Sequence, residues 1–348
     1  MIHHNEQTSS VFSNLQQHGG NFEDEFKRNI TTCNSLVIAS GYFGVSVLEK
    51  YKSSLLQVAE RGSCKILVGM VFHEGVSASQ KRALEQLHSD LSQVSVDSGV
   101  YITLRNYHGK IYRFTDGDHE SIYVGSSNFS DSGFRTNYEF NTLVQEAETR
   151  QQVNTFIRFL FSDRCDFVQP LDMVELVVRG SKTKIEKQEY DNLKSMEIAA
   201  SEYPAGSPVN LIKIQLRPDE QPSSSLNLCF EAGRKSKGKY TPRPWHEVEI
   251  TSTKIERTQQ GFPRGEFTAY VKDENRFYRI PMITASADFK ALTSKGNRSI
   301  LGMLMKDRLE RVGALKRGER ITSETLTDYG NDSVTLKMIS KGVYIFDF

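Results

Sequence analysis

The sequence predicts an α/β domain followed by a mostly-β domain. Over about the first 165 residues, apolar strand-like runs alternate with amphipathic helical patterns, which is typical of layered α/β structure. From about residue 209 onward, short strand-like runs are separated by turns rich in Gly, Pro, Asn and Asp, the pattern of a sandwich or barrel. A chain of 348 residues is also longer than one hydrophobic core usually organises, so two domains are expected.

The first elements are read from their hydrophobic periodicity. Two near-continuous apolar runs, SLVIASGYFG and CKILVGMVF, predict buried strands. A helix is expected around Asn21 to Cys33, a second from Val45 to Arg61, and a third from Ser77 to Val94. In the third, apolar residues recur at three- and four-residue spacing, at Leu84, Leu87, Leu91 and Val94.

Three further strands complete this part of the first domain. They are VYITLRN, KIYRFTD and SIYVGSS, and a Gly-Asp turn at Asp116 to His119 joins the last two. A strand at NTLVQEA and a final helix follow. The apolar face of that helix comprises Val153, Phe156, Ile157, Leu160 and Phe161.

Composition changes mark the domain boundaries. We expect a first domain at residues 1–170, a charged and then Pro/Gly/Ser-rich connector at 171–208, and a second domain at 209–348. The second domain has one clear helix, Arg298 to Val312. Its expected strands are LNLCFEA, HEVEITS, GEFTAYVKD, RFYRIPMIT, SVTLKMI and GVYIFDF.

Composition excludes several classes of protein. No apolar stretch is long enough to cross a bilayer, and the N-terminus MIHHNEQTSS has no signal or transit character, so we expect a cytoplasmic protein without membrane contact. Four scattered cysteines favour neither a zinc site nor disulfides, and no metal or other cofactor is expected. Residues 201–348 carry 24 Lys and Arg against 18 Asp and Glu, a balance of +6, whereas residues 1–200 carry 20 against 25, a balance of −5.

A group of polar residues in the first domain has the chemistry of a phosphate site. His108 and Lys110 are two residues apart on an expected strand, so both side chains leave the same face. Ser126, Ser127 and Asn128 form a turn at the end of another strand. Lys supplies positive charge, Asn and Ser supply neutral donors, and imidazole can attack phosphorus or carry a proton.

Glu139 lies eleven residues beyond Asn128, where a carboxylate could hold the distal nitrogen of His108. Together, HGK at 108–110, GSSN at 125–128 and Glu139 resemble the HxK, GSxN and E motif of the phospholipase D superfamily of nucleases and phosphodiesterases. The resemblance implies an α/β domain in which helices flank a mixed sheet. Neither Asp116 nor Asp118 is assigned the role of the aspartate that usually follows HxK.

The resemblance also implies the roles of these residues. His108 would be the nucleophile of a metal-independent reaction through phosphohistidine, while Lys110, Ser126 and Asn128 would bind the non-bridging oxygens and Glu139 would orient His108. The family's active site needs two such motifs, but the chain holds one. We therefore expect a homodimer in which two copies of His108 meet across a two-fold axis.

A basic segment near the start of the second domain suggests DNA contact. FEAGRKSKGKYTPRPWHEVEI contains Arg234, Lys235, Lys237, Lys239 and Arg243 and the only tryptophan. The lysines and Arg234 could contact phosphates and Arg243 could bind guanine, whereas Trp245 could serve the DNA contact or anchor the core.

The second half also resembles the plant B-three DNA-binding pseudobarrel. The order of the two domains is similar to restriction endonucleases of the BfiI and NgoFVII type. The resemblance implies one DNA-reading arm near Gly233 to Trp245 and another between Thr284 and Arg298, where Lys290, Lys295, Asn297 and Arg298 have suitable chemistry.

These features predict a site-specific, type II-like restriction endonuclease acting on double-stranded DNA. The resemblance implies a cognate methyltransferase and, in some relatives, a separate helicase-like ATPase. The chain itself has no Walker motif. Two alternatives stay open at this point: a nonspecific nuclease or phosphodiesterase of the same superfamily, and a catalytically inactive DNA-binding protein.

Overall fold

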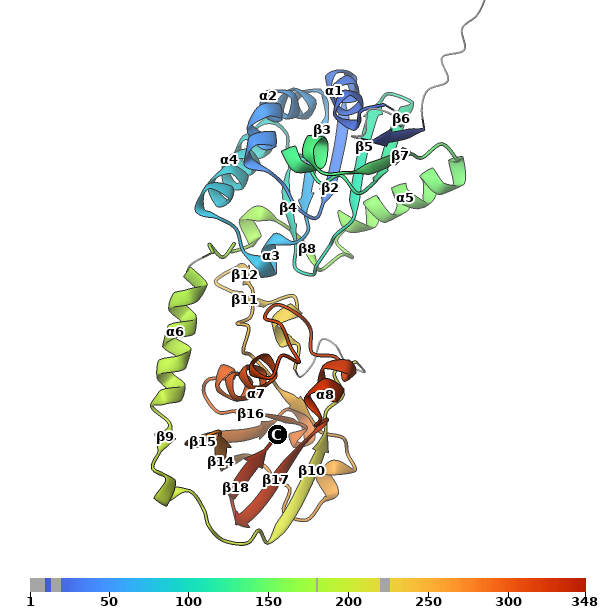
Figure 1. The fold of residues 1–348 in the computed structure, drawn as a ribbon. Helices are drawn as coiled ribbons and strands as arrows, with labels where there is room; N and C mark the ends of the chain where they lie inside the picture. The colour runs from blue at the N-terminus through green and yellow to red at the C-terminus, as the bar shows by residue number, and fades with distance from the viewer. Residues whose placement is uncertain (1–9, 14–19, 180, 220–225) are drawn as a thin grey trace, which may run out of the picture. The chain divides into compact units, whose positions relative to one another are not determined.

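The computed structural model describes residues 10–13, 20–179, 181–219 and 226–348 (Figure 1). Contacts divide the chain into two compact units. The first unit comprises Met1–Arg179 and Ala232–Pro242, and the second comprises Gly180–Glu231 and Arg243–Phe348. Within the described residues, no helix is both long enough and apolar enough to span a bilayer.

The first unit is built on an eight-stranded mixed sheet with the order β1-β7-β6-β5-β2-β3-β4-β8 (Figure 1). Strand β2 pairs in parallel with β3, and β3 with β4, whereas the other neighbours are antiparallel. The strands are β1 (Val11–Ser13), β2 (Ser35–Ser40), β3 (Ser63–Val68), β4 (Gly99–Thr103), β5 (Lys110–Asp116), β6 (His119–Gly125), β7 (Phe140–Leu143) and β8 (Val168–Pro170). The predicted α/β class of this part is confirmed.

Helices cover both faces of this sheet. They are α1 (Phe22–Thr32), α2 (Val45–Arg61), the short α3 (Val71–Glu74), α4 (Ala78–Val94) and α5 (Ala147–Leu160). The larger core packs α1, α2 and α4 against one face, and a smaller core packs α5 against the other. The crossovers β2-α2-β3 and β3-α4-β4 set three parallel strands side by side. The carboxyl ends of these strands therefore lie together at one end of the sheet.

Capping residues explain why the predicted helices begin where they do. The Asn21 side chain accepts a hydrogen bond from the backbone of Glu23 at the start of α1. Ser77 and Gln80 form a reciprocal capping box at the start of α4, which satisfies two amide groups that the helix leaves unpaired. The predicted α2, from Val45 to Arg61, is confirmed.

The second unit is a curved, mostly-β sheet with the order β10-β17-β18-β14-β15-β16-β13, and β9 pairs with β15. Its strands are β9 (Glu197–Ile198), β10 (Asn210–Gln215), β13 (Ile250–Thr251), β14 (Glu266–Asp273), β15 (Arg276–Ala285), β16 (Ala291–Ser294), β17 (Ser333–Ser340) and β18 (Val343–Asp347). Its helices are α6 (Ser181–Lys194), α7 (Ser299–Arg311) and α8 (Ser323–Tyr329). The half-barrel confirms the predicted mostly-β class.

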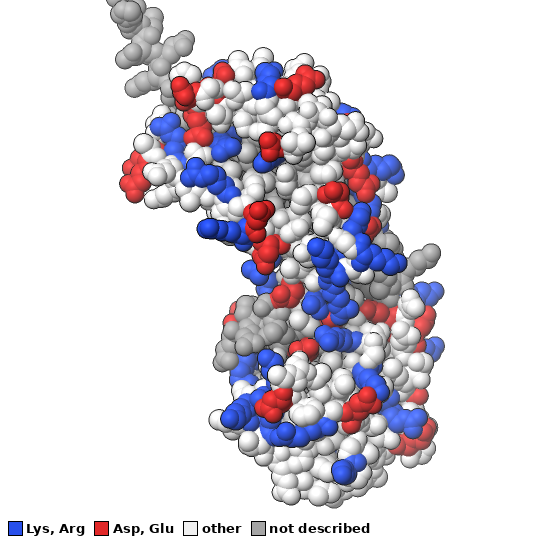
Figure 2. Space-filling view, turned by 180° about the vertical axis from the view of Figure 1, so that it is seen from behind, with Lys and Arg blue, Asp and Glu red and all other residues white. Residues whose placement is uncertain are grey.

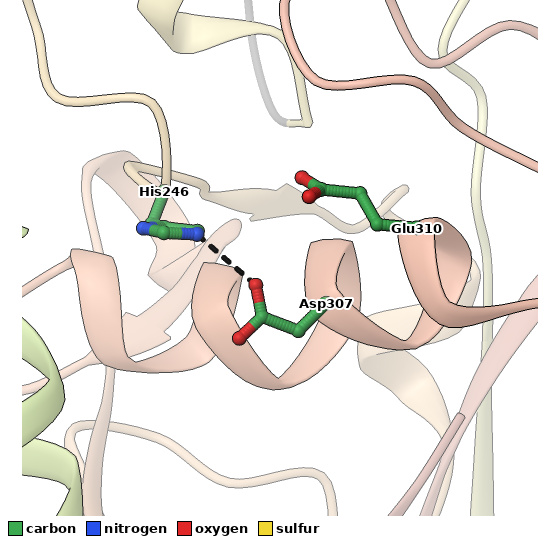
Figure 3. A group of neighbouring side chains, drawn as sticks. All are labelled: His246, Asp307 and Glu310. Carbon is green, nitrogen blue, oxygen red and sulfur yellow. Dashed lines mark hydrogen bonds and ion pairs between the residues drawn. The ribbon is translucent and has the colours of Figure 1, made fainter. Parts of the chain in front are cut away.

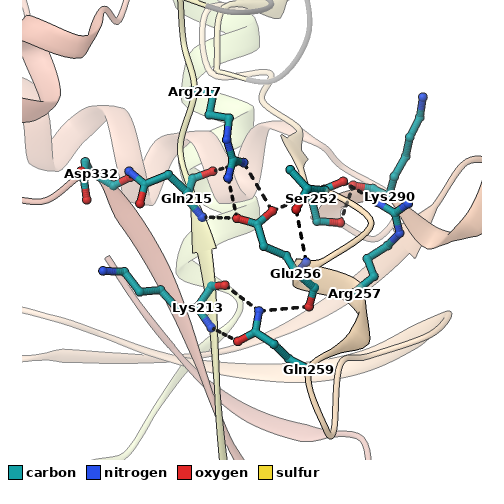
Figure 4. Close-up of polar contacts among 10 residues, drawn as sticks. Lys213, Gln215, Arg217, Ser252, Glu256, Arg257, Gln259, Lys290 and Asp332 are labelled. Carbon is teal, nitrogen blue, oxygen red and sulfur yellow. Dashed lines mark hydrogen bonds and ion pairs between the residues drawn. The ribbon is translucent and has the colours of Figure 1, made fainter.

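Side chains protect the exposed edge of β10 (Figure 4). The amide of Gln259 replaces a neighbouring strand by bonding both the N–H and the C=O of Lys213, at 2.9 and 2.8 Å. Glu256 accepts from the backbone of Gln215 at 2.8 Å and from Arg217 at 2.9 Å. These bonds occupy backbone groups that would otherwise be open to pairing with another chain. Burial raises the pKa of Glu256, but its hydrogen bonds outweigh burial and lower the pKa overall.

Several local predictions are wrong. Val94, expected on the apolar face of α4, is 39% exposed. LNLCFEA forms a 3-10 turn at Leu228–Phe230 instead of a strand, because Asn227 bonds the N–H and C=O of Ile321 with its side chain. HEVEITS contributes only the two-residue β13, since its first residues are held in ion pairs. In α5, Phe156 is 42% exposed, and the buried face consists of Ile157 and Leu160.

Candidate active site and DNA-binding residues

His108 and Lys110 meet at the beginning of β5. The strand starts at Lys110, and His108 lies just before it, in a segment without regular secondary structure rather than within the strand as expected. The Lys110 Nζ lies 3.1 Å from His108 Nδ1 and 3.3 Å from its Nε2. The imidazole is exposed, whereas Lys110 is only 6% exposed. An accessible imidazole therefore stands beside a cation that is largely removed from water.

Two glycines allow the segment around His108 to approach the sheet. A Cβ on Gly41, just after β2, would lie 3.2 Å from His108 Cα and Cδ2. A Cβ on Gly69, just after β3, would lie 1.9 Å from the carbonyl oxygen of Tyr107. The backbone of Tyr107 donates to the Gly69 carbonyl at 3.1 Å. The carboxyl ends of β2 and β3 thus hold the imidazole in place.

The electrostatic setting of Lys110 follows from its burial. Burial lowers the pKa of Lys110, and the negative charge of Glu139 opposes that shift. A partly desolvated ammonium group interacts strongly with an anion, because little water screens it. Lys110 is therefore suited to bind a phosphate oxygen.

Asn128 is oriented by the segment that follows β2. Its Oδ1 accepts a hydrogen bond from the backbone N–H of Tyr42 at 3.1 Å. Ser40, the last residue of β2, accepts from the backbone of Phe129 at 3.0 Å and pairs in the sheet with Lys110. Because the amide oxygen is engaged, the NH₂ group of Asn128 is the part left to donate to a ligand.

Ser126 and Glu139 form a contact of their own. The Ser126 hydroxyl donates to Glu139 Oε2 and accepts from the backbone of Phe140 at 3.0 Å, while Asn137 donates to Glu139 Oε1 at 3.2 Å. Glu139 is half-buried rather than fully buried. The bond expected from Glu139 to His108 is not among these contacts, so that role stays a prediction.

Ser127 has a structural role in the same turn. Its side chain is fully buried, and its hydroxyl accepts a hydrogen bond from Asn141 at 2.6 Å. Its carbonyl accepts from the Tyr112 hydroxyl at 2.8 Å. These two hydrogen bonds fix the buried side of the turn, between the exposed Ser126 and the half-buried Asn128.

Sequence reasoning missed Tyr42. Its ring meets the His108 ring edge-on, with centroids 5.7 Å apart and planes at 80°. Its hydroxyl donates to Glu74 at 2.8 Å, and burial followed by this bond raises the pKa of Tyr42 to about 12. The position of SGYFG at the carboxyl end of a buried strand was the available indication, since ligands bind at such ends in open α/β sheets.

The predicted DNA-reading residues fall into both units. Arg234, Lys235 and Lys237 belong to a hairpin that clusters with the first unit, whereas Arg243 and Trp245 belong to the second. Arg243 pairs with Glu247 at 2.8 Å. The Trp245 Nε1 donates to Glu310 at 2.8 Å, and Lys306 Nζ lies 4.0 Å from the centre of its ring.

The second expected arm is also held by local contacts. Lys295 pairs with Glu266 at 2.6 Å, and Arg298 with Glu249 at 3.4 Å. The Asn297 side chain accepts a hydrogen bond at 3.0 Å from the backbone of Ser299, the first residue of α7. On the face that Figure 2 shows, basic and acidic side chains are interspersed in each unit, so net charge alone does not mark a DNA-binding surface.

A His-carboxylate cluster in the second unit has metal-ligating residue types (Figure 3). The ligand atoms of His246, Asp307 and Glu310 all lie within 4.8 Å of one another. His246 is fully buried, with Nε2 3.1 Å from Asp307 and Nδ1 3.5 Å from Glu189 of α6. Burial lowers the pKa of His246, but the two carboxylates outweigh burial and raise it. The cluster therefore acts as an ion-pair network that fastens α6 to α7.

Comparison with known families decides what these two units are. Residues 21–170 match the family model described as the NgoFVII restriction endonuclease N-terminal PLD domain. Residues 205–340 match the NgoFVII C-terminal B3-like DNA-binding domain. The chain belongs to the NgoFVII restriction endonuclease family. The first match of the NgoFVII family contains His108, Lys110, Asn128 and Glu139, and the second contains the strands of the curved sheet from β10 to β17.

Solved structures give similarities that cover part of the chain. The phospholipase D family member Nuc from Salmonella typhimurium is 13% identical, with 47% of this chain and 96% of that chain covered and a TM-score of 0.34. NucT from Helicobacter pylori is 18% identical, with 43% and 92% covered and a TM-score of 0.32. Phosphatidylserine synthase from Haemophilus influenzae Rd KW20 is 14% identical, with 54% and 46% covered and a TM-score of 0.36. A comparison with curated proteins finds no match.

Proposed function

We propose that this NgoFVII-family protein is a site-specific endonuclease that hydrolyses DNA phosphodiesters without a metal ion. The observation that carries the proposal is the meeting of His108 and Lys110 at one sheet edge, 3.1 Å apart, next to an Asn128 amide whose oxygen is already engaged. A nucleophile, a cation and a neutral donor converge there, as attack on an anionic phosphodiester requires.

In the proposed reaction, a ring nitrogen of His108 attacks phosphorus and forms an N–P bond as the P–O bond to the leaving nucleoside breaks. A second histidine protonates that leaving oxygen and then, as a base, activates the water that splits the N–P bond. Lys110, Asn128 and Ser126 bind the non-bridging oxygens. In the free protein Ser126 donates its one hydroxyl hydrogen to Glu139. Bound substrate is proposed to take over that hydrogen bond, which frees Glu139 to orient His108.

The second histidine is proposed to come from a second copy of the chain. One HxK motif supplies half of a two-histidine site, so two first units would join across a two-fold axis with one composite centre. Such an enzyme would cut the two DNA strands in succession. A specific activity that stays constant on dilution, while light scattering reports monomers, would contradict this part of the proposal.

The second unit is proposed to find the DNA sequence. Its candidate base-reading residues are Arg243, Trp245, Lys295, Asn297 and Arg298. Several are paired with carboxylates in the free protein, so DNA binding would exchange those ion pairs for contacts with bases and phosphates. Residues 1–170, 171–208 and 209–348 are the proposed nuclease domain, linker and reading domain, with the exception of Ala232–Pro242, which clusters with the first unit. A methyltransferase and a helicase-like ATPase are proposed partners encoded elsewhere.

Cleavage of a long duplex by the purified protein tests the function. Discrete fragments are expected from a site-specific enzyme, and a smear from a nonspecific nuclease. Intact DNA despite sequence-dependent binding would identify an inactive DNA reader. The matched control is Asn192→Ala, the same substitution at an exposed position of α6 that has no role in the proposed site. It should retain activity that Asn128→Ala loses.

A further inference from the structure

The basic segment that precedes Arg243 folds as a preformed hairpin. Strands β11 (Arg234–Ser236) and β12 (Lys239–Thr241) pair antiparallel, and Ser236 lies opposite Lys239. The two turn residues, Lys237 and Gly238, have φ of 50° and 82°. Positive φ at both positions is the geometry of a tight hairpin turn, where Asn-Gly is the favoured pair. The lysine at the tip is therefore held in a conformation that suits asparagine better.

This hairpin is fastened to the catalytic unit. The C=O of Tyr240 accepts from the backbone of Glu175 at 2.9 Å, and Tyr240 packs against the larger core of the first unit. Gly233 has φ of 79°, and a Cβ there would lie 2.8 Å from the Phe72 ring. The base of the hairpin thus rests directly on α3.

The same short helix reaches the candidate active site. Phe72, under the hairpin, is two residues from Glu74, which accepts the hydroxyl hydrogen bond of Tyr42. The Tyr42 ring in turn meets the His108 ring. Three contacts, Gly233 to Phe72, Glu74 to Tyr42 and Tyr42 to His108, together with the single turn of α3, therefore connect the hairpin base to His108.

The charge of the hairpin is exposed and available. Lys235, Lys237 and Lys239 are all exposed, and Lys235 lies 5.2 Å from the centre of the Tyr240 ring. Across the described ranges of the chain, no carboxylate pairs with Lys237 or Lys239. This contrasts with Arg243 and Lys295, each of which has a carboxylate partner.

We infer that the β11–β12 hairpin is a phosphate clamp of the catalytic unit, which grips the DNA backbone beside the scissile bond and reads no base. The inference rests on the proposed function of His108 and deepens it, because it assigns these lysines to holding the substrate for cleavage. Lysine is a point charge without the planar fork that reads guanine, and phosphate contacts position DNA without specifying its sequence.

The first test compares two double variants by fluorescence anisotropy with a short duplex of arbitrary sequence over a salt series. Lys237→Asn with Lys239→Gln removes two positive charges, and asparagine suits the turn, so the hairpin should stay folded. The control, Lys27→Gln with Arg28→Gln, removes the same charge from exposed positions on α1. Helix α1 leads into the amino end of β2, whereas the candidate active site lies at its carboxyl end.

Each lysine that contacts phosphate contributes about −0.9 to the slope of log affinity against log salt. The hairpin variant should therefore have a slope shallower by about 2, and the α1 variant should match the wild type. In cleavage assays, kcat/KM of the hairpin variant should fall while its preference for the cleaved sequence over single-base variants is unchanged. A changed sequence preference would overturn the inference, as would an equal slope change in both variants.

A second measurement locates the hairpin on DNA. The four native cysteines are all buried, so an iron chelate can be attached selectively through Lys239→Cys. We expect the chelate to cut DNA within roughly ten base pairs, one helical turn, of the break that depends on His108. Cutting only farther away would contradict the clamp. A different result would separate the two proposals. If the slope of log affinity against log salt depends on the hairpin lysines but the wild-type protein cleaves no DNA, the proposed function is contradicted and the phosphate contact is retained.

Discussion

Glu23 provides a quantitative prediction about the stability of the catalytic unit. Its carboxylate is buried, at 6% exposure, and accepts hydrogen bonds from Lys50, from Tyr51 at 2.8 Å and from Nε and Nη2 of Arg135 at 2.9 Å. Arg135 lies in the short π-helix Ser132–Thr136 just after Asn128. Glu23 therefore joins α1 and α2 to the turn that presents Asn128.

The magnitude follows from the pKa. Burial by itself raises the pKa of Glu23, but the bonds from Arg135, Lys50 and Tyr51 outweigh burial and set it at about 2, against an ordinary value of 4.5. That difference corresponds to about 3 kcal/mol of folding free energy. Because the folded pKa is the lower one, this stabilisation is present above pH 4.5 and is lost as the pH falls toward 2.

Glu23→Gln should therefore destabilise the first unit by about 3 kcal/mol at pH 7, and the difference from wild type should shrink as the pH falls below 4.5. The assay is urea unfolding of the full chain. Amide hydrogen exchange reports the first unit, and the fluorescence of Trp245, the only tryptophan, reports the second. A loss below about 1 kcal/mol, a pH-independent loss, or an equal shift in the Trp245 transition would refute the reasoning.

Two further predictions concern a positioning residue and a buried histidine. Tyr42→Phe removes the hydrogen bond to Glu74 but keeps the ring against His108. Loss of about 1 kcal/mol should lower kcat/KM roughly fivefold and leave KM little changed. An unaltered rate would show that the hydroxyl does not position His108. His246 has a raised pKa, so its stabilisation is present below pH 6.5 and is lost as the pH rises through the folded pKa. The Trp245 unfolding midpoint should decline over that range in the wild type and stay flat in His246→Gln, and parallel curves would contradict this.

Much of the first unit could be predicted from the sequence because its helix caps and hydrophobic patterns are local features of the chain. Asn21 and Ser77 cap helices whose apolar faces repeat at helical spacing, and SLVIAS is buried on both sides as a parallel strand must be. The HxK and GSxN elements lie at strand ends, so the sheet register alone brings Lys110 beside Ser40 and the turn of Asn128.

What could not be predicted depends on contacts between distant residues. LNLCFEA has the apolar content of a strand, but the Asn227 side chain supplies the bonds that a neighbouring strand would have supplied. Tyr42 reaches His108 and Glu74 only after three loops converge at one sheet edge. The sequence predicts that the basic hairpin belongs to the second domain. In the structure, Gly233 and Tyr240 instead pack against the first unit. No local pattern encodes that choice.

The central claim is histidine-dependent cleavage of DNA without a metal ion. The most direct measurement incubates a long duplex with the purified protein in excess EDTA, with His108→Ala beside the wild type. The account predicts discrete fragments from the wild type and intact DNA from His108→Ala. Cleavage that requires added magnesium, or an undiminished His108→Ala variant, would contradict it.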